Sequence, residues 1–483
     1  MMKCAYPCVA VASLLLCFYG VFQPKACGDV TLPRVFSDHM VLQRDRPLPI
    51  WGWADPGEAV TVSLDAASPS TTAPSTTAPS NTTTADANGH WKVVLPALQA
   101  DGKTHSLTIT GKNKIDLQDI LIGEVWIGSG QSNMGFRLSG STGGKEAIAA
   151  ADYPEIRLLH VAHVRATQPA TDISVDDGNE KDNGKSIVTT GPGWKLCSPK
   201  SVPDFSAVLF YFGQRLHKEL TVPIGLIDSS WASSRIEAWT VSLPRGSGMY
   251  NAMIAPLQPF AIRGAIWYQG EANVNDKIGP TYAEKMKTLI NGWRQTWGED
   301  LSFYFVQIAP FGGRNPGTLP ALWECQDASL KIPGTGMAVI TDLVDDIKNI
   351  HPKNKFDVGN RLALWALAKD YGRKDIVYSG PIFKSMKVEG KTIRLSFAHV
   401  GSGLKSRDGK PLSEFEIAAA DGKFVPADAV IDGETIVVSA KEIPAPTQAR
   451  FGWRNEAQPN FINKEGLPAA PFETEHWQGG TGE

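Results

Sequence analysis

Two regions of the chain alternate hydrophobic and polar residues with a period of two, at residues 30–118 and 375–475. This period is typical of strands that bury one face. It predicts the strands Leu48–Trp53, Ala59–Leu64, His90–Leu95 and Ser106–Thr110 in the first region, and Met386–Val388, Thr392–Phe397 and Thr435–Ser439 in the second. Turns that contain glycine, such as Asn88-Gly89 and Asp432-Gly433, separate the strands. Both regions are therefore predicted to form β-sandwich-like domains.

Between these regions, residues 119–374 alternate apolar strands with helical patterns of hydrophobic residues. The predicted strands are Leu121–Ile127, Ile224–Ile227, Gly264–Tyr268, Phe303–Ile308 and Met337–Thr341. The predicted helices are Ala207–Leu220, Tyr282–Trp297, Ala321–Lys331 and Asp357–Tyr371. This alternation is typical of an α/β domain with a parallel sheet.

The first 28 residues have the pattern of an export signal. Lys3 precedes an apolar run from Val9 to Phe22, and the small residues Ala26-Cys27-Gly28 follow before Asp29. The run is short for a membrane span. We therefore divide the chain into a signal peptide (1–28), an N-terminal β domain (29–118), an α/β domain (119–374) and a C-terminal β domain (375–483). The mature protein is expected in the periplasm or outside the cell, without a membrane partner.

One segment of the N-terminal domain departs from the strand pattern. Residues 68–84 are rich in Ser, Thr and Pro and contain a tandem PSTTA repeat. Because such a sequence cannot bury a core, it predicts a solvated loop.

Composition excludes several classes of protein. Lys and Arg number 47 against 50 Asp and Glu, a net charge of −3 without a long basic run, which argues against a nucleic-acid partner. The nine His are scattered and no CxxC or HExxH motif occurs, so no metal site is expected. After loss of the signal, Cys197 and Cys325 remain. They form either one disulfide or, as we favour, two buried thiols.

A glycine-rich turn, Gly128-Ser129-Gly130-Gln131-Ser132-Asn133-Met134, follows an apolar strand. Glycines at this point permit a tight turn with positive φ. Ser132 is then presented at the carboxyl edge of the sheet, where α/β domains bind ligands. If a helix begins there, its free N–H groups would stabilise an oxyanion. Taken alone, the turn is equally consistent with a serine that caps a helix.

His351 lies in Ile350-His351-Pro352, after the last strand of the α/β region. Pro352 can occupy the first turn of a helix. The positive end of that helix favours the neutral imidazole, which is the form that acts as a general base. A structural histidine is the alternative. The order of a serine after the first strand and a histidine after the last favours catalysis.

A third motif, Trp267-Tyr268-Gln269-Gly270-Glu271-Ala272-Asn273, also ends a predicted strand. The side-chain amides of Gln269 and Asn273 can donate hydrogen bonds to an oxyanion. Glu271 can hold a sugar hydroxyl or orient a neighbouring residue. The alternative is a polar turn whose amides cap the next helix.

A fourth motif extends from Asp228 to Trp239. The backbone N–H of Ala232 or Ser233 can complete an oxyanion hole. Trp231 or Trp239 can stack on a sugar, although core packing explains both tryptophans as well.

The strings GEVWIGSGQSNM, LIDSSWASSRIEAW, IWYQGEAN and IHPKNK occur in this order. Together they resemble the sialate O-acetylesterase family of SGNH (GDSL-type) hydrolases. The opening VTLPRVFSDHMVLQRDRPLPIWGWADPGE is similar too, so the resemblance covers nearly the whole mature chain. It implies a three-layer α/β esterase domain flanked by β domains, and removal of acetyl groups from sugars without a metal ion or cofactor.

Roles follow from the resemblance, motif by motif. It implies Ser132 as the nucleophile and His351 as the base. The expected oxyanion donors are Ala232 or Ser233 through the backbone and Gln269 or Asn273 through the side chain. The residues expected to contact the acetylated carbohydrate are Gln131, Glu271 and Trp239.

The sequence departs from the family pattern at two places. Many members have Trp-Gly-Gly where this chain has Trp231-Ala232-Ser233, and a positive φ there is strained in Ala or Ser. Many members also carry Asp two residues before the histidine, where this chain has Asn349. We predict Asp346 as the acid that orients His351. The alternatives are Asp345, Glu271 or a Ser–His dyad without an acid.

Other functions stay open at this point. Glu124 and Glu271 could form the carboxylate pair of a glycoside hydrolase, and the chain could bind carbohydrate without catalysis. An α/β-hydrolase fold is a further alternative, although Met134 breaks its G-x-S-x-G motif. Sialate, xylan and other polysaccharides are all possible acetylated substrates, and the oligomeric state is open.

Overall fold

The computed structural model describes residues 29–66, 79–175, 193–241, 247–276, 281–475 and 479–482. The predicted export signal lies outside these ranges, as does most of the Ser/Thr/Pro-rich segment. No helix of the described ranges is long and apolar enough to cross a membrane. Cys197 and Cys325 are both free thiols, as expected; Cys197 is buried, whereas Cys325 is only half-buried.

A central sheet runs in the order β13-β12-β11-β7-β10-β8-β9. Its strands are β7 (Lys114–Gly130), β8 (Tyr153–His160), β9 (Trp194–Cys197), β10 (Ile224–Ser230), β11 (Gly264–Tyr268), β12 (Ser302–Val306) and β13 (Thr335–Ala338). Neighbours from β13 to β8 pair in parallel, and β9 joins β8 antiparallel. The predicted parallel sheet is therefore confirmed, with an antiparallel strand added at one edge.

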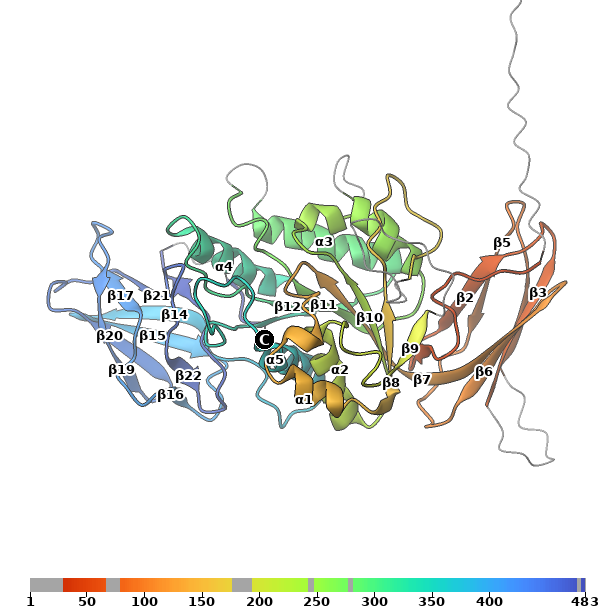
Figure 1. Cartoon of the computed structure of the whole chain (residues 1–483). Coiled ribbons are helices and arrows are strands. Elements are labelled where there is room, and N and C mark those ends of the chain that lie inside the picture. Colours follow the sequence, from red (N-terminus) through yellow and green to blue (C-terminus); the bar gives the residue numbers. More distant parts are fainter. Residues whose placement is uncertain are drawn as a thin grey trace, which may run out of the picture.

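Helices cover both faces of this sheet, which gives the three layers expected (Figure 1). One face carries α2 (Ala207–Leu220), α5 (Lys355–Lys369) and the short α1 (Gly144–Ala149), and the other carries α3 (Tyr282–Trp297) and α4 (Thr318–Ala328). Side chains cap the N-termini of three helices. Ser206 caps α2, Asn354 caps α5, and Thr281 with Glu284 forms a capping box on α3. The predicted bounds of α2, α3 and β11 match the observed ones.

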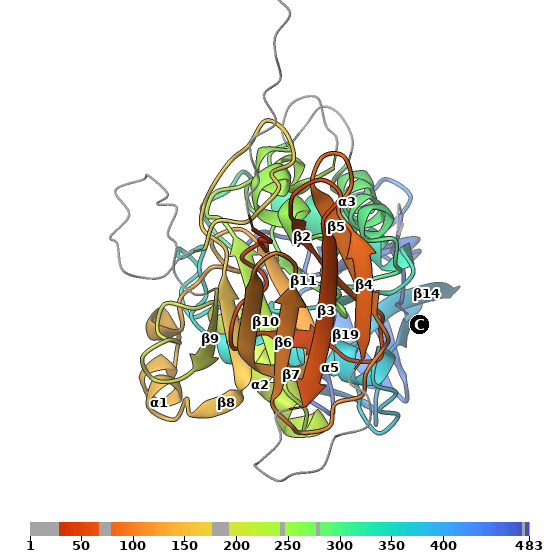
Figure 2. The same ribbon diagram turned by 90° about the vertical axis from the view of Figure 1, so that its right-hand side faces the viewer.

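The N-terminal β domain and the central sheet share one strand. Residues 114–120 of β7 pair antiparallel with β6 (His105–Thr110), residues 121–123 pair with β1 (Val41–Gln43), and residues 124–130 pair with β10. Residue 118, where the sequence pattern changes, thus lies inside a continuous strand. Figure 2 views the molecule from this end, with β3 (Ala59–Ala66), β4 (Ser80–Thr84) and β6 in front, beside the smaller pair of β2 (Leu48–Trp53) and β5 (His90–Leu95).

The prediction of a solvated loop was wrong for part of residues 68–84. Ser80–Thr84 forms strand β4, which pairs antiparallel with β3. The Oγ1 atoms of Thr61 and Thr82 are hydrogen-bonded across the pair at 2.8 Å. Because β4 is polar on both faces and lies on the exposed surface, it carries no alternation of hydrophobic residues that would reveal a strand.

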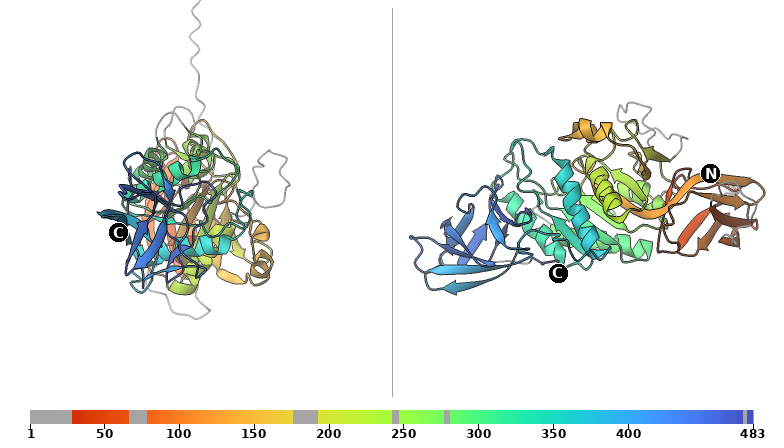
Figure 3. Two further views of the ribbon diagram at one scale, coloured as in Figure 1. Left: turned by 90° about the vertical axis from the view of Figure 1, so that its left-hand side faces the viewer. Right: turned by 90° about the horizontal axis from the view of Figure 1, so that it is seen from below.

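The C-terminal β domain has its own hydrophobic core, in which phenylalanine side chains such as Phe383, Phe397, Phe451 and Phe472 pack together. Two four-stranded antiparallel sheets and a short pair enclose it, with strands β14 (Ile382–Glu389), β15 (Thr392–Ala398), β16 (Leu404–Ser406), β17 (Phe415–Ala418), β18 (Val425–Pro426), β19 (Asp428–Asp432), β20 (Thr435–Ser439), β21 (Gln448–Phe451), β22 (Phe461–Asn463) and β23 (Phe472–Glu473). The end of the chain returns to the α/β domain, where the N–H of Gly480 donates to the carbonyl of Asp327 (Figure 3, right).

Candidate active site

Ser132 lies in a tight turn directly after β7. Gly130 ends that strand with a φ of 136°, and a Cβ atom there would lie 2.2 Å from the carbonyl oxygen of Tyr268, so only glycine fits. The N–H groups of Met134 and Gly135 then donate to the carbonyl of Gln131, at 2.9 and 3.0 Å. The turn does not continue into a regular helix. It presents Ser132 half-buried at the carboxyl edge of the sheet.

His351 meets Ser132 at this edge. It lies in the segment between β13 and α5, and its Nε2 atom is 2.8 Å from Oγ of Ser132. Burial lowers the pKa of His351, and the nearby cation of Lys355 lowers it further. Both effects favour the neutral imidazole, which is the form that can accept the serine proton.

Asp346 does not take the position predicted for it. Its carboxylate is exposed and accepts a hydrogen bond from the backbone N–H of Lys348 at 2.9 Å. Asn349 instead contacts the backbone of the histidine: the N–H of His351 donates to Oδ1 of Asn349 at 3.0 Å. Among the described residues, no carboxylate accepts a hydrogen bond from the His351 ring. The geometry is that of a Ser–His dyad.

A buried polar chain underlies the dyad. Nδ2 of Asn133 donates to Oε1 of Glu271 at 2.6 Å and to the carbonyl of Ile350 at 3.1 Å. Oδ1 of Asn133 accepts a hydrogen bond from Nζ of Lys355 at 2.6 Å. Asn133 follows Ser132 and Ile350 precedes His351, so this amide joins the two segments that carry the serine and the histidine.

The two ionisable groups of this hydrogen-bond network, Lys355 and Glu271, are deeply buried. Burial lowers the pKa of Lys355 to about 7 and raises the pKa of Glu271. The ammonium of Lys355 also lies 4.9 Å from the ring centroid of Phe136 and 5.0 Å from that of Tyr268, a cation–π arrangement that offsets its lost hydration. The Oε2 atom of Glu271 and the hydroxyl of Tyr268 are buried without a hydrogen-bond partner within the described ranges.

The loop after β10 carries backbone N–H groups beside the turn of Ser132. The loop after β10 is anchored beside it, because the N–H of Trp231 donates to the carbonyl of Gly130 at 3.0 Å. Ser233 has a φ of 58°, so the strained left-handed conformation expected at this position is present. In the portion of the chain that is described, the N–H groups of Ser132, Ala232 and Ser233 have no acceptor. They remain available to an oxyanion.

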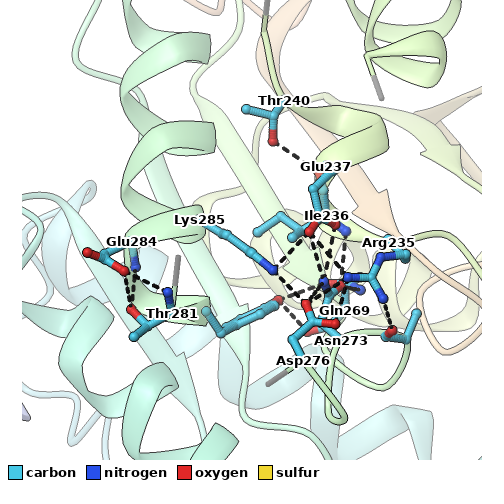
Figure 4. A network of polar contacts seen from close by, with 12 residues as sticks. Arg235, Ile236, Glu237, Thr240, Gln269, Asn273, Asp276, Thr281, Glu284 and Lys285 are labelled. Carbon is cyan, nitrogen blue, oxygen red and sulfur yellow. Dashed lines mark hydrogen bonds and ion pairs between the residues drawn. The ribbon is translucent and has the colours of Figure 1, made fainter. Parts of the chain in front are cut away.

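The amides of Gln269 and Asn273 are occupied elsewhere, which contradicts their expected role as oxyanion donors. Nε2 of Gln269 donates to Gln131, Ser234 and Asn273 at 2.8–3.2 Å. Nδ2 of Asn273 donates to Asp276 at 2.9 Å and to Glu237 at 3.1 Å. Figure 4 shows both amides inside a network that reaches Arg235 and Lys285. They hold the loop after β11 in place.

The residues expected to contact the sugar also have internal partners. Oε1 of Gln131 accepts from Gln269 and from the N–H of Ala272, both at 3.2 Å. Trp239 is 0% exposed and donates from Nε1 to Ser234 at 2.9 Å, so its predicted stacking on a sugar was wrong. Glu271 is buried against Asn133.

Glu124 and Glu271 do not form the carboxylate pair of a glycoside hydrolase. Glu124 is fully buried and is bound by Arg44 at 2.6 Å and by Arg263 at 2.9 Å. Glu124 pairs with Ile224, the first residue of β10. Along β7, Glu124 lies six residues before Gly130, a distance of roughly 20 Å. Glu124 and Glu271 therefore lie at opposite ends of the strands, whereas glycosidases need carboxylates less than about 10 Å apart.

Sequence reasoning missed Lys355 and gave Asn133 no role. Lys355 is the first residue of α5 and lies four positions after His351. A lysine at a helix start is normally solvated, so its burial has no signal in the pattern. Asn133 was visible beside Ser132, but its partners come from two distant segments. The described residues hold no cluster of three or more His, Cys, Asp or Glu side chains that could bind a metal ion.

Comparisons with known proteins agree with this geometry. Residues 122–368 match the family described as carbohydrate esterase, sialic acid-specific acetylesterase. Human sialate O-acetylesterase is 28% identical over 90% of this chain and 91% of its own, and the mouse protein is 30% identical over 73% of this chain and 75% of its own. The crystal structure of a carbohydrate acetylesterase from Xanthomonas citri is 38% identical, with a TM-score of 0.83, and covers 93% of this chain and 100% of that chain.

Proposed function

Because this chain belongs to the sialic acid-specific acetylesterase family of carbohydrate esterases, we propose that Ser132 and His351 are the nucleophile and the general base of its reaction. The enzyme is a carboxylic ester hydrolase that removes O-acetyl groups from sugars. The observation that supports the assignment is the 2.8 Å contact between Oγ of Ser132 and Nε2 of His351.

The reaction passes through an acetyl-enzyme. His351 accepts the proton of Ser132 at Nε2 while Oγ attacks the acetyl carbonyl, which becomes a tetrahedral oxyanion. When the bond to the sugar oxygen breaks, His351 returns the proton to that oxygen and the sugar alcohol leaves. Water, deprotonated by His351, then attacks the acetyl-serine, and acetate and free Ser132 are released.

The oxyanion is stabilised by the backbone. The N–H of Ser132 and the N–H of Ala232 or Ser233 are the donors, since these groups have no acceptor among the described residues and the loop of Ala232 is anchored to Gly130 through Trp231. Asn133, Glu271 and Lys355 act as positioning residues, because their hydrogen bonds tie the turn of Ser132 to the segment of His351.

Turnover of an aryl acetate by Ser132→Ala and His351→Ala tests this assignment. Each variant should lose about a thousandfold or more in kcat, because the nucleophile or its base is missing. Ser139→Ala is the matched control, since Ser139 is an exposed serine of the following segment. Labelling with a fluorophosphonate should modify Ser132 in the wild type and fail in Ser132→Ala. Activity close to wild type in either catalytic variant would contradict the proposal.

We also propose that residues 1–28 direct export and are removed. The support is the apolar run after Lys3 and the small residues that precede Asp29. The mature enzyme would then act in the periplasm or outside the cell. Sequencing the N-terminus of the protein recovered outside the cytoplasm should find a start at or near Asp29. A start at Met1 in that fraction would contradict the proposal.

A further inference from the structure

Two polar residues at the end of β10 are buried and have no role in the proposed reaction. Asp228 is 1% exposed and Ser230 is 2% exposed. Earlier in the strand, the same face carries the apolar residues Ile224 and Leu226. Because a buried carboxylate costs free energy unless it is hydrogen-bonded or paired, the change to polar residues at this edge of the sheet indicates a specific role for Asp228.

The carboxylate of Asp228 has neighbours from three segments. Its Oδ1 atom accepts a hydrogen bond from Oγ of Ser230 at 2.7 Å, and its Oδ2 atom lies 3.8 Å from Nε2 of His160, the last residue of β8. The backbone N–H of Ser206, the N-cap of α2, faces the same carboxylate. Burial raises the pKa of Asp228, and these neighbours oppose that rise. Asp228 therefore joins β8, β10 and the start of α2.

The hydroxyl of Ser230 packs against the turn of the nucleophile. A Cβ atom at Gly135 would lie 2.8 Å from Oγ of Ser230, closer than side chains normally pack. Ser206 is tied to the same turn, since its Oγ donates to the carbonyl of Met134 at 2.6 Å. Through Ser230 and Ser206, the buried carboxylate thus supports the turn from two sides.

Ser230 also fixes the start of the loop that carries the proposed oxyanion donors. Its carbonyl oxygen lies 2.9 Å from Nε2 of His163. The next residue, Trp231, donates from its N–H to the carbonyl of Gly130 at 3.0 Å. An oxyanion donor is effective only about 2.7–3.1 Å from the charged oxygen. The placement of Ser230 therefore controls whether the two N–H groups that follow Trp231 can reach it.

We propose that Asp228 is a positioning residue of the esterase reaction. It holds the hydroxyl of Ser230 against the turn of the nucleophile, and Ser230 sets the position of the N–H groups of Ala232 and Ser233. The inference rests on the proposed function, in which those groups stabilise the oxyanion formed at Ser132. Asp228 and Ser230 act on the transition state through the backbone, because both are buried away from the substrate.

Ser230→Ala tests this role through the difference between kcat and KM on an aryl acetate. The variant should lose about tenfold in kcat while KM stays within about twofold, because the donors are misplaced and the substrate surface is unchanged. Phenylboronic acid forms a tetrahedral adduct with a serine nucleophile and so resembles the transition state. Its inhibition constant should rise by the same factor as kcat falls.

Ser229→Ala is the matched control. Ser229 is a buried serine of the same strand, and its Oγ donates to the carbonyl of Met253 at 3.0 Å on the other face of the sheet. Both serine variants lose one buried hydrogen bond, so both should lower the melting temperature. Only Ser230→Ala should change catalysis, and kcat and the inhibition constant should stay within about twofold of wild type in Ser229→Ala.

Gly135→Ala tests the same contact from the side of the turn. In the wild-type background its Cβ atom pushes the hydroxyl of Ser230 away from Asp228, and about tenfold should be lost in kcat. In the Ser230→Ala background the nearest atom is the Cβ of residue 230 at 3.9 Å, an ordinary contact. Gly135→Ala should then add no further loss. An equal loss in both backgrounds would assign the effect to the turn itself and overturn the proposal.

Asp228→Ala should reduce kcat about as much as Ser230→Ala. The double variant should lose no more than the larger of the two single losses, because the two residues act through one hydrogen bond. If Asp228→Ala does not fold, the variants of Ser230 and Gly135 decide the question.

Four results would overturn the role of Asp228: an unchanged kcat and inhibition constant in Ser230→Ala, a loss in KM alone, the same loss in Ser229→Ala, or losses that multiply in the double variant. Failure of the proposed function has a different signature. It would appear as aryl acetate turnover that survives in Ser132→Ala, whatever the variants of Asp228 and Ser230 do.

Discussion

Lys355 donates a hydrogen bond from Nζ to Oδ1 of Asn133 at 2.6 Å, at a depth that solvent does not reach. The amide of Asn133 continues the chain to Glu271 and to the carbonyl of Ile350. A carboxylate and an ammonium are thus linked through one amide, directly beneath the contact between Ser132 and His351. We therefore expect the reactivity of Ser132 and His351 to depend on Lys355, Asn133 and Glu271.

The first prediction concerns the pH dependence of the wild-type enzyme. The pKa of His351 is lowered by burial and by the charge of Lys355, and only the neutral imidazole can accept the serine proton. The acid limb of kcat/KM on an aryl acetate should therefore have its midpoint below about 6.5, the ordinary pKa of histidine. A pH–rate profile measures it, and a midpoint clearly above that value would contradict the prediction.

Lys355→Met should move this acid limb to higher pH. Lys355 is cationic below its own pKa of about 7, so in the acid range it disfavours the imidazolium of His351. Removing that charge raises the pKa of His351. Lys353→Met is the matched control, because Lys353 is an exposed lysine of the same segment and should leave the profile unchanged. An acid limb that stays in place in Lys355→Met, in a protein that is still folded, would refute the coupling.

Asn133→Ala should reduce kcat more than KM. The substitution cuts the hydrogen bonds from the nucleophile turn to Ile350, Glu271 and Lys355, so the dyad loses its alignment while the substrate surface remains. We expect at least a tenfold loss of kcat, and a loss of roughly 2 kcal/mol in the free energy of unfolding, because buried polar partners are left unpaired. Asn360→Ala on α5, which removes a bond within that helix, should change neither kcat nor KM.

Ser233→Gly should stabilise the protein without a loss of activity. Ser233 has a φ of 58°, and glycine adopts that conformation without the strain of a Cβ atom. We expect a gain of about 1 kcal/mol or less, since glycine also adds freedom to the unfolded chain. Thermal unfolding measures the gain. Ser233→Ala keeps the Cβ atom and should show none, so equal melting temperatures for the two variants would count against strain at this position.

Asn455→Ala, a substitution in the C-terminal domain, should lower both the stability of the protein and kcat. Asn455 is buried, accepts the N–H of Leu319 at 3.1 Å and donates to the carbonyl of Asn315 at 2.8 Å. The same loop carries Arg314, whose Nη2 atom donates to the carbonyl of Glu271 at 2.8 Å. We expect a loss of about 2 kcal/mol in stability, together with lower kcat.

Glu456→Gln, which removes a charge at the adjacent position and keeps the side-chain size, is the control for Asn455→Ala and should behave as wild type. Denaturant unfolding and aryl acetate turnover check both variants. If Asn455→Ala kept full kcat at a temperature where it is folded, the position of the loop that carries Arg314 would not depend on the C-terminal domain.

Much of the α/β domain could be predicted from the sequence, because its helices and strands carry strong local patterns. The hydrophobic stripes of Ala207–Leu220 and Tyr282–Trp297 lie within the helices, and the capping residues Ser206 and Thr281 directly precede them. The polar strand Ser80–Thr84 could not be found in this way, since pairing with β3 rather than hydrophobic alternation defines it.

The pairing of Ser132 with His351 could be predicted because each follows a strand of one parallel sheet. The roles of Gln269, Asn273 and Asp346 could not. A side-chain amide or carboxylate looks the same in a sequence whether it faces a substrate or a neighbour, and these three bind neighbours. Only the full set of hydrogen-bond partners distinguishes the two cases.

Strand β7 has a practical consequence for dissecting the enzyme. Its first half belongs to the N-terminal sheet and its last residue, Gly130, directly precedes the turn of the nucleophile. A shortened protein that began at residue 119 would start partway along this strand and would lack β1, its partner there. The N-terminal part is therefore not an appendage that can be trimmed away, and an independently folding catalytic fragment would have to include it.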